Sequence, residues 1–269
     1  MSTLAPTRPR TRRQVSQARV VRSEWIKLWS LRSTVTTLAV GVFLLVGIGL
    51  LASSVYADGG LAGPAPGDGP VDAVGASLAG TTFAQLAFGT LGVLLTAGEY
   101  GTGMIRSSMA AVPRRLPVLW AKIVVFTGVV LVLTLAATAI TFAAGQAIIG
   151  DGGTSWSDPG VARALVGTAV VLTLSGVLGI GLGALLRSTP TAITTLFGVM
   201  FLLSGVAQLL FPESWSSGLK YLPANASTAF TAVTQAPDTL TPWAGLAVFG
   251  GYVVAVVVAA AVRLKRSDV

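Results

Sequence analysis

The residues best suited to binding a partner lie close together in the segment 99–122, which reads EYGTGMIRSSMAAVPRRLPVLWAK. Residues 104–112 have helical spacing, with Met104 and Ile105 on one face, and Pro113 ends the stretch. Arginines rim this stretch, and a guanidinium can donate two parallel hydrogen bonds to a carboxylate. The candidate partner-binding residues are Glu99, Tyr100, Met104, Ile105, Arg106, Arg114 and Arg115. Such a surface suits docking into a groove of another protein, and an ordinary lipid-lying loop is the alternative interpretation.

The sequence offers little for catalysis. It contains no histidine and no cysteine, which excludes a Ser–His–Asp relay and the common zinc sites. None of its lysines follows the glycine that a Walker A motif requires, so we expect this chain not to bind ATP through a P-loop. No nucleophile–base pair or metal cluster can be assembled from the remaining residues. We therefore expect no catalytic residue, no metal site and no cofactor on this chain, which by itself is not an enzyme.

The elements that position these residues are six long apolar stretches. The chain has 269 residues, of which 53% are hydrophobic and only 10% charged, and its mean hydropathy is +0.78. A helix that crosses a membrane needs about 20 apolar residues, and continuous apolar runs favour helices over a barrel of alternating strands. The expected spans are about 34–54, 76–98, 123–149, 164–186, 191–211 and 243–262, and none of them contains Lys, Arg, Asp or Glu. The composition thus predicts an all-α integral membrane protein.

Basic residues predict the orientation of these spans. Of the 18 Lys and Arg residues, all but Arg163 and Lys220 lie before the first span, between spans two and three, between spans four and five, or after the last span. The positive-inside rule therefore places both termini in the cytoplasm. We interpret the net charge of +8 as a sign of topology and of contact with anionic lipid, and we expect no nucleic-acid partner.

A further helix is expected before the first span. Residues 1–19 are rich in Arg, Thr, Ser, Pro and Gln and are predicted to be a disordered basic cytoplasmic tail, followed by a six-span transmembrane domain at 20–269. Residues 20–32 place Trp25 and Trp29 on an apolar face and Lys27 on the opposite face. This pattern predicts an interfacial amphipathic helix in which Lys27 and Arg32 snorkel to the membrane surface. Either it is an elbow helix that touches a cytoplasmic partner, or it is a simple membrane anchor.

Small polar residues recur at helical spacing within several spans. Their first explanation is close packing of helices through small side chains. The alternative is that some of these faces line a transport pathway. The candidate pathway-lining residues are Thr81, Gln85, Thr96, Thr134, Thr138 and Gln208.

The last outer loop, residues 211–242, is unusually long for a segment without regular structure. Asn225 is expected to cap a short helix at 226–236, which Pro223 and Pro237 bracket. The loop is either a lid over a pathway or a plain solvent loop.

Two segments resemble ABC-2 type transporter permeases of actinobacteria. The first is residues 22–34, RSEWIKLWSLRST. The second is residues 98–106, GEYGTGMIR, followed by PRRLP at 113–117 and by Lys122. The order of amphipathic helix, span, outer loop, span, inner loop and four further spans is also similar over nearly the whole chain.

The resemblance implies a specific architecture and function. In that family the first segment is the elbow helix, and the second forms a cytoplasmic coupling helix between spans two and three, facing an ATPase subunit. It implies a multi-pass permease of the bacterial cell membrane that works with a second permease subunit, identical or related. ATP and Mg would be bound by the separate ABC ATPase, and an amphiphilic or hydrophobic substrate would be exported. The alternative is a non-transporting polytopic membrane protein, such as an assembly or sensory factor, that docks a cytoplasmic partner.

Overall fold

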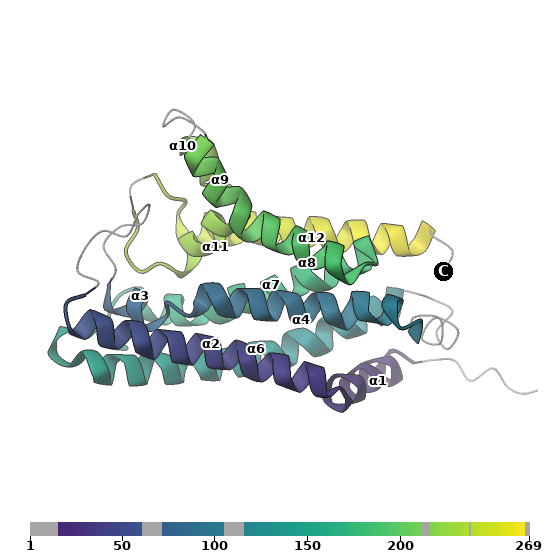
Figure 1. Ribbon diagram of the computed structural model, residues 1–269, viewed down its shortest axis with the longest axis horizontal. Helices are drawn as coiled ribbons and strands as arrows, with labels where there is room; N and C mark the ends of the chain where they lie inside the picture. Colours follow the sequence, from purple (N-terminus) through teal and green to yellow (C-terminus); the bar gives the residue numbers. More distant parts are fainter. Residues whose placement is uncertain (1–15, 61–71, 105–115, 211–215, 237, 267–269) are drawn as a thin grey trace, which may run out of the picture.

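The computed structural model describes residues 16–60, 72–104, 116–210, 216–236 and 238–266, and every regular element in these ranges is a helix. Six helices in the described part are long and apolar enough to cross a membrane. Apart from the helix Thr189–Leu210, which is inclined to the others, they run roughly parallel or antiparallel in an elongated bundle (Figure 1). They are α2 (Arg32–Ala57), α4 (Thr81–Gly101), α6 (Leu116–Ile149), α7 (Val161–Leu186), the continuous α8–η2–α9 helix (Thr189–Leu210) and α12 (Pro242–Arg266). The prediction of an all-α polytopic membrane protein is therefore confirmed.

The helix boundaries differ from the predicted spans at two places. Residues 73–77 form a separate short helix, α3 (Ala73–Ser77), so the second crossing helix begins at Thr81. Asp72 caps α3, because its carboxylate accepts the backbone N–H of Gly75 at 2.6 Å. The crossing helices also extend past the apolar stretches at the other end, so that Glu99 lies within α4 and Lys122 within α6. The stretches carry no charge, but the helices do.

The centre of the bundle is the pair α4 and α7, which approach each other through glycine. A Cβ atom on Gly92 would lie 1.9 Å from the carbonyl oxygen of Gly176, and one on Gly179 would lie 2.0 Å from that of Gly89. Both distances are far below any van der Waals contact, so no larger side chain fits without moving the backbone. Close packing through small residues, as in many membrane helix pairs, therefore sets the spacing of these two helices.

A two-residue turn connects α7 to the fifth crossing helix. Arg187 ends α7 in the left-handed conformation with φ of 58°, and Pro190 occupies the first turn of α8 (Thr189–Phe197). A π-helical turn, η2 (Gly198–Leu202), precedes α9 (Leu203–Leu210). Beyond this turn α9 diverges from the other helices (Figure 1), and Leu209 is 87% exposed.

The amphipathic helix before the first span is present as α1 (Gln17–Ser30) and is separated from α2 by Leu31. It starts within the segment that was predicted to be a disordered tail. Its buried side chains are Val20, Glu24 and Leu28, so the inward face carries a carboxylate that the amphipathic pattern did not predict. Residues 1–15, and the predicted coupling helix beyond Met104, lie outside the described residues.

Three short helices lie toward the opposite end of the molecule: η1 (Gly150–Gly152), α10 (Ser216–Leu219) and α11 (Pro223–Thr231) (Figure 1). The predicted cap at Asn225 is wrong, because α11 begins at Pro223 and the Asn225 amide donates to the carbonyl of Leu219 at 2.8 Å. Arg163 of α7 donates to the carbonyls of Phe230 and Ala232 at 2.8 and 2.9 Å. It thereby satisfies carbonyls at the C-terminal end of α11, which explains one of the two basic residues on this side.

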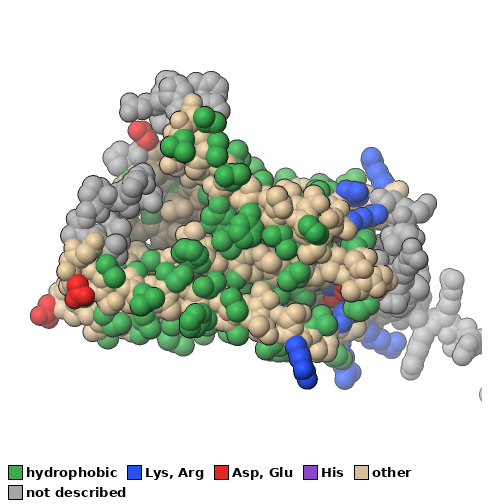
Figure 2. Space-filling model, in the orientation of Figure 1, with side chains coloured by type: hydrophobic (Ala, Val, Ile, Leu, Met, Phe, Trp, Pro, Cys, Tyr) green, Lys and Arg blue, Asp and Glu red, His purple; other side chains and the backbone are tan. Residues whose placement is uncertain are grey.

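Charge divides the molecule along its length. In Figure 2, Lys and Arg side chains gather at the end that carries α1 and the last turn of α12, and most of the acidic side chains in view lie toward the other end. We call these the basic end and the acidic end. The long face that this view shows between them carries mainly hydrophobic and uncharged side chains, as expected for a surface that meets lipid.

Candidate functional site

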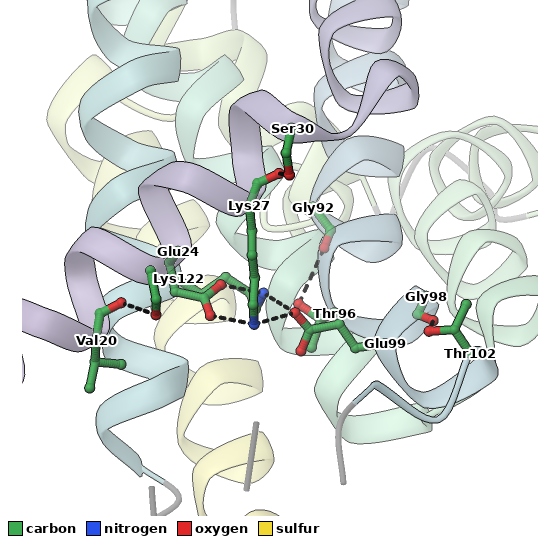
Figure 3. Close-up of polar contacts among 11 residues, drawn as sticks. Val20, Glu24, Lys27, Ser30, Gly92, Thr96, Gly98, Glu99, Thr102 and Lys122 are labelled. Carbon is green, nitrogen blue, oxygen red and sulfur yellow. Dashed lines mark hydrogen bonds and ion pairs between the residues drawn. The ribbon is translucent and has the colours of Figure 1, made fainter. Parts of the chain in front are cut away.

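Four charged side chains meet at the basic end and form an ion cluster (Figure 3). Glu24 and Lys27 come from α1, Glu99 from the last turn of α4, and Lys122 from the second turn of α6. The Lys122 ammonium lies 2.8 Å from Glu24 Oε2 and 3.0 Å from Glu99 Oε1. The Lys27 ammonium lies 2.8 Å from Glu24 Oε1 and 3.2 Å from the same oxygen of Glu99. Two cations thus bridge two carboxylates, and the cluster is neutral.

The cluster is largely buried. The side chains of Glu24, Lys122 and Glu99 are 4%, 6% and 8% exposed, and only Lys27 reaches the surface, at 27%. Removing charges from water is unfavourable, and each buried charge depends on its partners for compensation. Loss of one member would leave the remaining buried charges without full compensation, so the cluster favours one arrangement of the three helices.

Burial opposes the charged form of Glu24 and would raise its pKa, but the neighbouring Lys122 and Lys27 outweigh burial and hold the pKa below its ordinary value of 4.5. Burial likewise opposes the charged form of Lys27, yet its bonds to Glu24 and Glu99 raise its pKa above 10.5. The contribution of Glu24 to stability is present above 4.5 and is lost as pH falls through its lowered folded pKa. The contribution of Lys27 is present below 10.5 and is lost as pH rises through its raised folded pKa.

The structure brings together two predicted residues, Glu99 and Lys27, and adds two that sequence reasoning missed. Glu24 and Lys122 lie in the segments that resemble permeases, but their spacing in the sequence did not predict that they would form ion pairs. The only local signal is that Glu24 shares the i, i+4 stripe of Val20 and Leu28. Lys27 was expected on the side away from the membrane face, and it instead points to the two carboxylates.

The remaining partner-binding candidates divide into two groups. Tyr100 lies beside the cluster, with the Arg187 guanidinium carbon 5.3 Å from its ring centroid, and Met104 ends the described part of this segment with 39% exposure. The others, Ile105, Arg106, Arg114 and Arg115, lie outside the described residues. Glu99 Oε1 is paired with Lys27 and Lys122. Glu99 Oε2 has no partner among the described residues.

The elbow-helix candidates other than Lys27 lie on the outer side of α1 and at the start of α2. Trp25 and Trp29 are 49% and 48% exposed, and their rings pack edge to face with centroids 5.9 Å apart. Arg32 is exposed at the first residue of α2. Exposed indoles beside basic residues at the end of a bundle are typical of the membrane–water interface.

Three of the six pathway-lining candidates line a cavity and three do not. Thr81, Gln85 and Gln208 line a cavity of about 750 Å³ at the acidic end, which we call the outer cavity. Thr96, Thr134 and Thr138 do not line it. Their hydroxyls donate to backbone carbonyls of their own helices, to Gly92, Val130 and Leu135 respectively.

Comparison with known proteins adds no relative. No protein-family model matches the chain, and no curated protein matches it. In the described part of the chain, no three His, Cys, Asp or Glu residues lie close enough together to hold a metal ion. Functional inference therefore rests on the ion cluster, the outer cavity and the charge division.

Proposed function

We propose that this chain is the membrane-spanning permease subunit of an ATP-driven ABC transporter of the ABC-2 type. It acts with a separate ATPase subunit, which binds ATP and Mg, and with a second permease subunit. Its substrate is amphiphilic or hydrophobic and is exported across a bacterial cell membrane. Both termini and the ion cluster face the cytoplasm, because the positive-inside rule assigns the basic end to that side.

The observation that carries this proposal is the position of the ion cluster. Glu99 and Lys122 flank the inner segment 102–115, which bears the predicted docking residues, and both are bonded to the amphipathic helix α1. A force applied to that segment by a cytoplasmic partner would reach α1, α4 and α6 together. A subunit that converts a partner's movement into helix movement needs such a rigid connection, whereas a simple loop between two spans does not.

The proposal predicts that the chain, purified in mild detergent from the cells that make it, carries a separate subunit with a Walker A motif. ATP hydrolysis should appear only in that complex. Ile105→Asp, which places a charge in the expected apolar contact, should abolish co-purification, because a packed apolar anchor contributes about 2 kcal/mol or more to an interface. Arg115→Ala should weaken it modestly and mainly at low salt, because a rim charge contributes less and is screened by added salt.

Two outcomes would contradict the proposal. ATP hydrolysis by the chain alone would contradict the assignment of ATP binding and hydrolysis to a separate subunit. Stable co-purification of a cytoplasmic partner without ATPase activity would instead favour an assembly or sensory factor.

A further inference from the structure

We infer that the outer cavity is a binding site for an amphiphile with an uncharged, hydrogen-bonding headgroup, held by Gln85 and Thr168. That such an amphiphile is the transported substrate rests on the proposed function. That the cavity binds it does not. The cavity lies between α3, α4, α7, α11 and residues 232–236 and 238–240. Figure 2 shows the surface hollowed at the acidic end, next to α3 and α11.

Thr168 is the first observation that points to a ligand. Thr168 lines the outer cavity and is fully buried, with 0% exposure. Its hydroxyl has no hydrogen-bond partner among the described residues. Buried threonines elsewhere in the bundle behave differently: Thr141 and Thr173 donate to the carbonyls of Ala137 and Ala169 at 2.7 and 2.8 Å. An unsatisfied buried hydroxyl destabilises a fold, so its presence beside a cavity requires an explanation.

Gln85 is the second observation. It lies on α4, is 7% exposed and lines the same cavity. Its amide nitrogen donates to the Ser175 hydroxyl at 2.9 Å, and Ser175 in turn donates to the carbonyl of Val171 at 2.8 Å. The amide is thereby held in position, while its carbonyl oxygen has no partner among the described residues. Cavity-facing Gln85 therefore offers a fixed acceptor, and Thr168 offers a hydroxyl that can donate or accept.

Three charged residues line the cavity, Asp72, Lys220 and Asp238, and none of them is buried. One carboxylate oxygen of Asp72 accepts a hydrogen bond from the Gly75 N–H at 2.6 Å, and the other accepts one from the Thr234 hydroxyl at 3.0 Å. Lys220 lies over the ring of Tyr221, and Asp238 is exposed. The buried lining thus presents hydroxyls and amides but no free charge, and burying a charged headgroup there would be costly.

Apolar side chains form another part of the lining. The buried or partly buried side chains include Ala52, Leu78, Val171, Ala229 and Leu240. An alkyl chain fits such walls through the hydrophobic effect, and the two polar groups fix the headgroup, as in most small-molecule sites. The bonds from Arg163 hold α11 and the following segment in place as one wall.

The test uses the full chain in lipid nanodiscs without any ATPase. The probe is dodecyl maltoside with a diazirine in its alkyl chain, applied below its critical micelle concentration, and cross-links are mapped by mass spectrometry. We expect saturable labelling of α3, α4 and α11. Unlabelled dodecyl maltoside should displace the probe better than dodecyl sulfate or dodecyltrimethylammonium, which have the same chain and a charged headgroup.

Thr168→Val and Thr138→Val form a matched pair of variants. Thr168→Val removes a hydroxyl without a protein partner, so thermal stability should stay the same or rise, while probe affinity falls about 3- to 10-fold. Thr138→Val makes the same change in a buried position outside the cavity and should leave probe affinity unchanged.

Three results would overturn the inference: labelling that does not saturate, equal affinity in the two variants, or stronger displacement by a charged competitor than by the maltoside. If the chain does not bind the probe but still forms an active complex with an ATPase, the inference about the outer cavity would be contradicted and the proposed function would not. If the chain binds the probe but co-purifies with no ATPase subunit from the cells that make it, that result would instead count against the proposed function.

Discussion

Lys122 is the residue on which the ion cluster depends most, because it is 6% exposed and bonded to both carboxylates. Lys122→Met should leave Glu24 and Glu99 with Lys27 as their remaining partner in the cluster. Removing one partner of a buried pair typically costs about 3–5 kcal/mol. We therefore expect a clear fall in the melting temperature of the purified chain, measured in detergent. The exposed Lys265 is the matched control, and Lys265→Met should change the melting temperature little.

The same cluster can be tested for coupling by a double variant. Combining Lys122→Met with Glu24→Gln restores charge balance and leaves one ion pair, Lys27 with Glu99. The double variant should be more stable than the sum of the two single effects predicts. Strict additivity would mean that the cluster does not act as a unit.

At the scale of the helices, glycine fixes the distance between α4 and α7. Gly179→Ala places a methyl group 2.0 Å from the carbonyl oxygen of Gly89, so the helices must separate or the backbone must shift. We expect a loss of stability of about 1–3 kcal/mol, in the range of other overpacked cores. Gly128 of α6 is the control, because a Cβ there meets nothing within 4 Å. Gly128→Ala should be neutral or slightly stabilising, since alanine favours helix. Equal effects of the two changes on the melting temperature would contradict this account of the packing.

The helices themselves were predictable, and their partners were not. Hydropathy identified six spans, because a helix that meets lipid must carry an apolar run wherever it packs. The division of basic residues was equally visible in the sequence. By contrast, the Lys122–Glu24 pair joins residues 98 positions apart, and no local pattern encodes such a contact.

Hydroxyl side chains show the same limit more clearly. Threonines at helical spacing look alike in the sequence, yet Thr134 donates to its own helix and Thr168 does not. Which of them lines a cavity depends on how α3 and α11 fold over the acidic end.

The predicted start of α4 was wrong for a related reason. The Asp72 cap and the short helix α3 interrupt an apolar run that is continuous in the sequence.

At the scale of the whole molecule, one helix connects the two candidate sites. Gln85 lies at the outer cavity and Glu99 in the ion cluster, both on α4. Fourteen residues of helix span about 21 Å at 1.5 Å per residue. Because α4 packs tightly against α7 along this length, a shift at the ion cluster would be transmitted to the cavity with little bending. This is the arrangement that a permease driven from one side of the membrane requires.

That arrangement depends on the basic end facing the cytoplasm, which single cysteines can test. The chain has no native cysteine, so an introduced one has no background. Ser157, in the α6–α7 connection at the acidic end, and Thr102, after α4 at the basic end, are both exposed. In intact cells an impermeant maleimide should label Ser157→Cys and should label Thr102→Cys only after the membrane is permeabilised. Labelling of Thr102→Cys in intact cells, with Ser157→Cys protected, would reverse the orientation. The ion cluster would then lie outside the cell, out of reach of any ATPase.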